Sequence, residues 1–204
     1  MPTNVRITKN MILDTAFDIA RSGGLEDVSN REIASRLGCS IRPIYYQFKN
    51  TDELKGELYA KIEKYFYTYL MDNMRDDIPP YKQVGINYIR FAREESHLFR
   101  ILFMSETNLL PMGFVTKDED DFRKLAKFIK FSTKLSDDDI KTFHVRMWLF
   151  AHGIASLVAS NTVVFSDTQI EKLLSYEFQA LMLLEENPDN KWNIVNYKGG
   201  YYEE

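Results

Sequence analysis

Apolar residues recur at helical spacing along almost the whole chain, and this periodicity limits the fold more than any other feature. The first periodic segment spans residues 8–21, where Ile12, Phe17 and Ala20 share one helical face. The 9 glycines and 6 prolines of the 204 residues lie mostly between such segments, and no segment alternates convincingly as a strand does. The sequence therefore predicts an all-α protein of about nine helices.

Signals for helix ends frame the first three predicted helices. Gly23 and Gly24 stop the first helix in the way that C-terminal cap glycines do. Ser29 and Glu32 form an S-x-x-E capping box that opens a short helix ending at Gly38. Two short helices and a tight turn are therefore expected within residues 29–49.

A third short helix follows Gly38, and Ser40 is expected to cap it. Pro43 then falls in the first turn, where a proline is tolerated because first-turn amides have no intrahelical partner. Its outer face carries Arg42, Tyr45 and Tyr46, an unusual set for an ordinary core helix. This small helix is therefore the first candidate for a binding surface.

The chain divides into a small N-terminal part and a larger C-terminal part. Residues 1–50 form the first domain, residues 51–75 a long connecting helix, and residues 76–186 the second domain. The break falls at Asp76–Pro80, and residues 187–204 form a polar and aromatic tail without assigned structure. Further helices are expected near residues 81–94, 96–105, 118–131, 137–160 and 167–185.

Charge is distributed unevenly along the chain. Through Lys49 the chain carries seven basic and five acidic side chains, a balance of +2 against a net charge of −4 for the whole sequence. Any contact with nucleic acid is therefore expected near the start. With no long apolar run, no secretory signal and a single cysteine, the sequence favours a cytoplasmic protein with no membrane partner.

Two short helices joined by a glycine-containing turn form a helix-turn-helix, whose second helix enters the major groove of DNA. Arg42 can donate to guanine, Ile41 or Pro43 can touch a thymine methyl group, and neighbouring tyrosines can reach phosphates. Ile44 and Phe48 are spaced to point into the core. The pattern alone is equally compatible with a helical hairpin that carries ordinary exposed polar residues.

Residues 8–58, and above all Val28–Leu54 (VSNREIASRLGCSIRPIYYQFKNTDEL), resemble the N-terminal domain of TetR-family (TetR/AcrR-like) transcriptional regulators. The matching features are a first helix that ends in Gly-Gly, a Ser-x-x-x-Ile-Ala-x-x-Leu-Gly helix, and the run Tyr45…Phe48-Lys49. The resemblance implies a homodimeric repressor that binds a palindromic operator in double-stranded DNA and is released by a small, unidentified apolar effector.

The resemblance also assigns roles within the helix-turn-helix. It implies that Ser29 and Tyr45 bind phosphate, that Tyr46 faces bases, and that Lys49 anchors the next helix to the DNA backbone. Thr51 stands where many family members have lysine. The expected DNA-binding residues are Ser29, Ser40, Ile41, Arg42, Pro43, Tyr45, Tyr46, Lys49 and Thr51.

Cys39 stands where valine is usual in the family, so the resemblance implies a small buried core residue. A redox-sensing thiol is the alternative for this position.

The segment Trp148–Leu157 resembles the Trp…His-Gly helix of these regulators, which pairs with the following helix to form a dimer face. The helix is apolar over more than one side, as expected for a helix that packs both inside its own chain and against a partner. One larger monomeric bundle is the alternative. The expected interface residues are Ile154, Leu157, Val158, Leu174, Phe178 and Leu181.

Aromatic and methionine side chains are abundant, with 14 Phe and 8 Met. Between helices such residues can line an apolar ligand cavity, although simple core packing accounts for each of them singly. The expected cavity residues are Phe91, Phe99, Phe103, Met104, Phe122, Leu125, Met147 and Trp148.

Motifs for catalysis are missing from the sequence. It has no glycine-rich phosphate loop and no nucleophile elbow, and His144 and His152 are too far apart to bind a metal from adjacent turns. We therefore expect no enzyme, catalytic residue, metal or cofactor. Two alternatives stay open: an all-helical enzyme or small-molecule carrier without DNA binding, and an interaction module whose helix-turn-helix no longer binds DNA.

Overall fold

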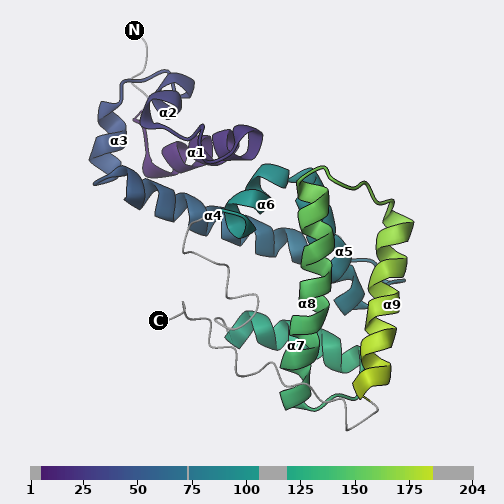
Figure 1. The fold of residues 1–204 in the computed structure, drawn as a ribbon. Coiled ribbons are helices and arrows are strands. Elements are labelled where there is room, and N and C mark those ends of the chain that lie inside the picture. The colour runs from purple at the N-terminus through teal and green to yellow at the C-terminus, as the bar shows by residue number, and fades with distance from the viewer. Residues whose placement is uncertain (1–5, 73, 106–118, 186–204) are drawn as a thin grey trace, which may run out of the picture. The chain divides into compact units, whose positions relative to one another are not determined.

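The computed structural model describes residues 6–72, 74–105 and 119–185. Within these ranges the chain forms nine helices and no strand, which confirms the all-α class (Figure 1). The predicted tail, residues 187–204, lies outside the described residues. The helices are α1 (Lys9–Gly23), α2 (Asn30–Arg36), α3 (Arg42–Gln47), α4 (Thr51–Met71), α5 (Pro80–Glu94), α6 (Ser96–Phe103), α7 (Glu119–Ser132), α8 (Asp137–Ala159) and α9 (Asp167–Glu185).

The chain divides into two compact units. The N-terminal unit joins Met1–Asp72 to Phe91–Pro111, and the C-terminal unit joins Asn73–Arg90 to Met112–Glu204. Helix α5 therefore begins in the C-terminal unit and ends in the N-terminal one. The predicted domains, residues 1–50 and 76–186 with a connecting helix between them, were assigned by function. These compact units do not test that assignment, so it stays a prediction.

In the N-terminal unit, α1 is the central element and packs against α2, α3, α4 and α6. The helix begins at its cap Thr8, whose hydroxyl accepts the Met11 amide, and it ends at Gly24. Gly24 has φ = 100°, a conformation that glycine adopts far more readily than other residues. The predicted Gly-Gly stop is therefore confirmed.

Helix α4 carries one continuous buried stripe. Its cap is Asn50, whose side chain accepts the Glu53 amide at 2.8 Å. Phe66 in the stripe contacts the rings of Phe91 and Phe103 at centroid distances of 5.1 and 5.3 Å. The stripe consists of Leu54, Leu58, Ile62, Phe66 and Leu70.

In the C-terminal unit, α8 packs against both α7 and α9. Ser136 caps α8 through the Asp139 amide. Ser166 and Gln169 form a reciprocal capping box at α9, with N···O distances of 2.8 and 3.2 Å. Both helices agree with those expected near residues 137–160 and 167–185.

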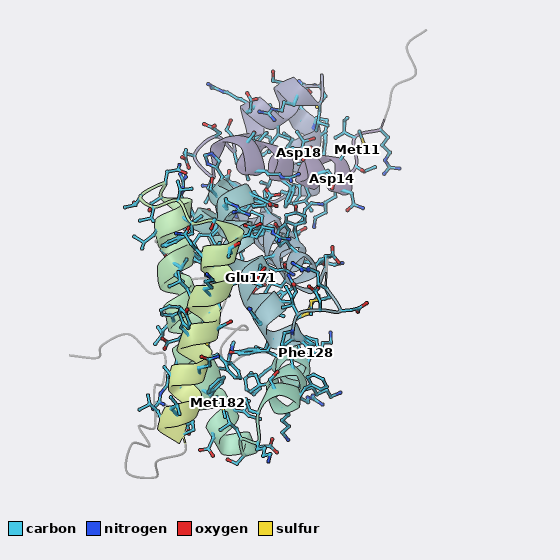
Figure 2. All side chains as sticks on the ribbon, turned by 90° about the vertical axis from the view of Figure 1, so that its right-hand side faces the viewer. Met11, Asp14, Asp18, Phe128, Glu171 and Met182 are labelled. Atoms are coloured by element: carbon cyan, nitrogen blue, oxygen red, sulfur yellow. The ribbon has the colours of Figure 1, made fainter. Side chains whose placement is uncertain are left out.

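Charged side chains cover the outer surfaces of these helices. Figure 2 labels Asp14 and Asp18 of α1, which are exposed, and Glu171 of α9. Lys61 of α4 forms an ion pair with Asp14 at 2.5 Å. Among the described helices, none is long and apolar enough to cross a membrane.

Candidate nucleic-acid interface

Helices α2 and α3 meet at a tight turn that contains Gly38. The Gly38 φ of 62° lies in the left-handed region, which glycine enters without steric cost. Ile33 and Ala34 of α2 and Ile44 of α3 are buried, as is Phe48 at the end of α3. Both short helices therefore turn one apolar side to the core of the N-terminal unit.

The opposite side of α3 faces solvent. Tyr46 is 85% exposed and Tyr45 58% exposed, and Arg42 and Ile41 are exposed as well. Helix α3 has only six residues, and its exposed aromatic rings contribute little to the stability of the fold. Arginine and tyrosine are instead suited to hydrogen bonding with base edges and phosphates.

The predicted cap of α3 is wrong. Helix α3 begins at Arg42 with Ile41 in the cap position, and no side chain caps it. The reason is chemical: the caps Thr8, Ser29, Asn50, Ser136 and Ser166 all accept the amide three residues further on. Three residues after Ser40 stands Pro43, which has no N–H to donate. The exposed Ser40 hydroxyl thus serves no cap.

Ser29 does cap α2, accepting the Glu32 amide at 3.2 Å. The second half of the predicted capping box is replaced, because the Glu32 carboxylate accepts from Arg36 Nε at 2.9 Å instead of from the Ser29 backbone. The Ser29 hydroxyl is exposed and keeps its proton for another acceptor.

The residues at the start of α4 are held by a second cap. The backbone N–H of Lys49 donates to Glu53 Oε2 at 2.6 Å, so the backbone is fixed while the Lys49 side chain is exposed. Thr51 is the first residue of α4 and is exposed. Asp52 and Glu53 follow in the same turn, which suits the helix dipole but weakens attraction for a phosphate at this point.

All nine predicted DNA-binding residues lie within α3 or at the starts of α2, α3 and α4. Eight are exposed, and Pro43 is half-buried. Ser29 precedes α2, the next six belong to α3 or its approach, and Lys49 and Thr51 stand at the start of α4. Cys39, expected in the core, is only half-buried.

Comparison with known proteins bears on this helix-turn-helix directly. Residues 12–58 match the sequence model of bacterial regulatory proteins of the tetR family. Over these residues the chain is therefore similar to the N-terminal region of that family. No curated protein sequence matches the chain.

Solved structures extend the likeness in fold over most of the chain. A transcriptional regulator from Rhodococcus sp. Rha1 has a TM-score of 0.58 at 18% identity, with 88% of this chain and 97% of that chain covered. A TetR-family regulator from Haemophilus influenzae RD has a TM-score of 0.56 at 18% identity, covering 84% and 94%. Both of these proteins are named as transcriptional regulators, and at this identity the likeness is one of fold.

The predicted cavity residues fall into two separate groups. Phe91 and Phe99 are fully buried in the N-terminal unit, where Phe99 stacks obliquely on Phe103 at a centroid distance of 4.8 Å. Met104 is exposed, and Leu125 of α7 is buried. Phe91, Phe99 and Leu125 therefore pack in the core, which was the alternative for these residues, whereas Met104 lies at the surface.

A small cavity does lie in the C-terminal unit, and Met147 and Trp148 line it. Its volume is about 30 Å³, room for a water molecule or two and far below the several hundred Å³ of typical ligand sites. Phe122 reaches it indirectly, through ring contact with His144 at 6.2 Å. The lining residues are Tyr81, Val84, Gly85 and Tyr88 of α5, His144, Met147, Trp148 and Ala151 of α8, and Leu174 of α9.

Two tyrosine–histidine pairs include residues that line this cavity, namely Tyr81, Tyr88 and His144. Tyr81 Oη lies 3.0 Å from His144 Nδ1, and Tyr88 Oη lies 2.8 Å from His152 Nδ1. Trp148 stacks on the His152 ring at a centroid distance of 5.0 Å. Burial raises the pKa of both phenols, so each tyrosine keeps its hydroxyl proton. The histidines are engaged by these hydrogen bonds, and no group of three or more metal-binding side chains occurs in the described part of the chain.

The sequence interpretation missed Tyr81, Gly85 and Tyr88 as cavity residues, and it placed Leu174 at the dimer interface instead. The signal was present, because Tyr81, Gly85 and Tyr88 recur at helical spacing along one side of α5. The mixture of polar and apolar side chains hid them from a search for apolar residues alone.

Most of the predicted dimer residues pack against other residues of the same chain. Ile154 and Val158 of α8 are buried, as are Leu174 and Leu181 of α9, and Phe178 packs on Phe143 at 5.3 Å. Leu157 is 42% exposed. Other apolar side chains that reach the surface of the same two helices are Leu149, Tyr176, Leu183 and Leu184.

Proposed function

We propose that this protein is a homodimeric, sequence-specific DNA-binding repressor that a small molecule releases from its operator. The observation that carries the proposal is the outer face of α3, where Arg42, Tyr45 and Tyr46 are exposed while Ile44 and Phe48 hold the helix in the core. The TetR-family match over the same residues supports it. The proposed place of action is the cytoplasm.

In this proposal α3 enters the major groove. Arg42 donates two hydrogen bonds to guanine, and Ile41 or Pro43 contacts a thymine methyl group. The Ser40 hydroxyl, which caps no helix, and Tyr46 face the bases. Ser29, Tyr45, Lys49 and Thr51 contact phosphates on either side, which sets the position of α3 without reading sequence.

The test compares Arg42→Ala with Lys49→Ala by fluorescence anisotropy on a selected operator and on a scrambled duplex. Arg42→Ala is expected to weaken operator binding by about 1–3 kcal/mol and to relax one base position. Lys49→Ala is expected to weaken binding to both duplexes alike and to flatten the salt dependence. If Arg42→Ala binds both duplexes as the parent does, Arg42 does not read bases.

Dimerisation is proposed through the outer side of α8. Leu149 is 52% exposed, Gly153 is exposed, and Leu157 follows at the same spacing of four residues. A Cβ at Gly153 would meet no atom within 4 Å in its own chain. Glycine inside a 23-residue helix costs about 1 kcal/mol relative to alanine, so a second helix that packs closely here would explain it.

Gly153→Arg tests this surface, with Gly56→Arg in α4 as the matched control. Both glycines are exposed, lie inside helices and have open space around them. Sedimentation is expected to give a monomer for Gly153→Arg and a dimer for Gly56→Arg and the parent. A dimeric Gly153→Arg protein would place the interface elsewhere.

Release by an effector is proposed to act through α5. The same helix lines the small cavity with Tyr81, Val84, Gly85 and Tyr88, and its last turn belongs to the N-terminal unit. At about 30 Å³ the cavity must widen to admit an effector, so binding would have to displace its lining. A protein that binds a small molecule in this cavity but selects no DNA would instead be a helical carrier or enzyme.

A further inference from the structure

A buried carboxylate marks the point where α5 ends and α6 begins. Glu95 is 4% exposed, its N–H donates to the Phe91 carbonyl at 2.8 Å, and its carbonyl accepts the Phe99 amide at 2.8 Å. One residue thus terminates one helix and caps the next. The course of the chain at this junction depends on how the Glu95 side chain is held.

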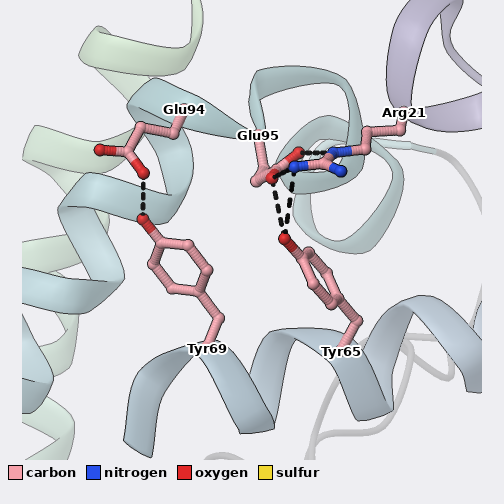
Figure 3. Close-up of polar contacts among 5 residues, drawn as sticks. All are labelled: Arg21, Tyr65, Tyr69, Glu94 and Glu95. Atoms are coloured by element: carbon pink, nitrogen blue, oxygen red, sulfur yellow. Dashed lines mark hydrogen bonds and ion pairs between the residues drawn. The ribbon is translucent and has the colours of Figure 1, made fainter. Parts of the chain in front are cut away.

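Two other helices hold that carboxylate (Figure 3). Arg21, in the last turn of α1, donates from Nε to Glu95 Oε2 at 2.7 Å and from Nη2 to Oε1. Tyr65 of α4 donates to Oε1 at 2.9 Å, and the Arg21 guanidinium lies 5.7 Å from the centre of the Tyr65 ring. We call Arg21, Tyr65 and Glu95 the junction triad.

The ionisation of the triad is consistent with this arrangement. The hydrogen bond to Glu95 raises the pKa of Arg21, and burial together with the same carboxylate raises the pKa of Tyr65. Both partners therefore keep their protons as donors over the whole physiological range. The carboxylate accepts three hydrogen bonds from two directions, which fixes α1 and α4 against the α5–α6 junction.

Stability alone gives little reason for such a group. Only the Glu95 carboxylate of this pair is buried, because the Arg21 side chain is 50% exposed. The cost of removing that carboxylate from water offsets the attraction within the pair. Apolar packing of α1 and α4 against α6 is already present in this unit. What directional bonds add is geometry, since a bidentate arginine–carboxylate pair accepts only a narrow range of orientations.

We propose that Glu95 is a positioning residue for operator recognition: the junction triad fixes α1 and α4, and with them the helix-turn-helix, in the orientation that reads two half-sites at one spacing. The inference rests on the proposed function. Helix α1 packs against both α2 and α3, so a rotation of α1 would carry the recognition helix with it.

The chain offers a matched control in Glu94, the residue that precedes Glu95. Tyr69, one turn beyond Tyr65, donates to Glu94 Oε2 at 2.5 Å, and Glu94 is exposed (Figure 3). Glu94→Gln and Glu95→Gln make the same chemical change to neighbouring tyrosine–carboxylate pairs. The Glu94 pair reaches only one helix, whereas Glu95 reaches two.

The experiment measures the affinity of the parent, Glu95→Gln and Glu94→Gln for a selected operator and for the same operator with one base pair inserted between its half-sites. Circular dichroism first establishes a temperature at which all three proteins are folded. Glu95→Gln is expected to lose about tenfold in affinity for the selected operator and little for the longer one. The ratio of its affinities for the two operators should therefore fall about tenfold. Glu94→Gln is expected to match the parent.

An equal loss of affinity for both operators would overturn the positioning role, because it would show only that a smaller fraction of the protein can bind DNA. So would a Glu95→Gln variant that matches the parent. A parent that binds no duplex would instead overturn the proposed function itself, a result that cannot be confused with the other two.

Hydrogen exchange gives a second readout that needs no DNA. Amides of α1 and α4 near Arg21 and Tyr65 are expected to exchange about tenfold faster in Glu95→Gln and at the parent rate in Glu94→Gln. Arg21→Lys, which keeps the charge but loses the bidentate geometry, is expected to fall between them. Unchanged exchange in Glu95→Gln would show that the triad does not hold these helices.

Discussion

The recognition helix and the cavity of the C-terminal unit use pairs of tyrosines in opposite ways. Tyr45 and Tyr46 of α3 stand in solvent. Tyr81 and Tyr88 of α5 are buried, and each hydroxyl lies within 3.0 Å of a histidine nitrogen. The same residue type thus presents an exposed hydroxyl in one region and a buried, hydrogen-bonded hydroxyl in the other.

The difference teaches where function can be changed without loss of the fold. A buried hydroxyl that already has a partner stabilises its own surroundings, and its removal leaves that partner unsatisfied. An exposed hydroxyl adds little to folding and is available to an external acceptor such as a phosphate. Substitutions in the two tyrosine pairs are therefore expected to affect different properties, stability in the buried pair and DNA binding in the exposed pair.

Tyr88→Ala is expected to lower the free energy of unfolding by about 3–5 kcal/mol, because a fully buried ring leaves a cavity. Tyr46→Ala is expected to change it by less than about 0.5 kcal/mol. Urea unfolding of the two variants measures both values. Similar losses in the two proteins would remove the distinction between the regions.

Tyr46→Ala is instead expected to weaken operator binding by about 1–3 kcal/mol, as for loss of a base-facing contact. Affinity is measured by anisotropy at fixed salt, with Asp18→Ala as a control on the exposed side of α1. An affinity equal to that of the parent would show that Tyr46 does not meet DNA.

The pH dependence of stability isolates His152. Burial lowers the pKa of His152 in the folded protein, so the unfolded chain takes up a proton at a higher pH than the folded one. Stability is therefore expected to fall as the pH drops through the unfolded pKa of histidine, near 6.5. Urea midpoints at pH 7.5 and 5.5 should differ less in His152→Gln than in the parent; an equal difference in both would assign the effect to other groups.

Tyr88→Phe removes only the hydroxyl that lies 2.8 Å from His152 and is expected to cost about 0.5–1.5 kcal/mol of stability. Tyr46→Phe, the matched change on α3, is expected to cost none. Thermal unfolding compares the pair. A loss of stability in Tyr46→Phe would mean that its hydroxyl has a partner within the fold.

The sequence predicted the helices well because their ends carry local chemistry. Gly24 and the Ser166–Gln169 box act on neighbours within a few residues, so the signal and the structure lie in the same short segment. The outer face of α3 was predictable for the same reason. The error at Ser40 was also local, since Pro43 three residues later removes the amide that a cap needs.

Long-range packing could not be predicted in this way. Phe91, Phe99 and Met147 look alike as apolar positions, yet the first two pack in the N-terminal unit and the third lines the cavity. Periodicity shows which face of a helix is buried, but not which neighbour covers it. The pairing of Arg21 with Glu95, 74 residues apart, left no trace in either local pattern.

The central claim, that α3 reads DNA as part of a dimer, is tested most directly by selecting random duplex DNA with the purified protein at two salt concentrations and sequencing the bound fraction. The predicted result is one enriched palindrome with two half-sites, bound more weakly at the higher salt. No enrichment even at the lower salt would contradict the claim for the protein without effector, and the cavity beside Tyr81 and Tyr88 would then become the first place to look for a function.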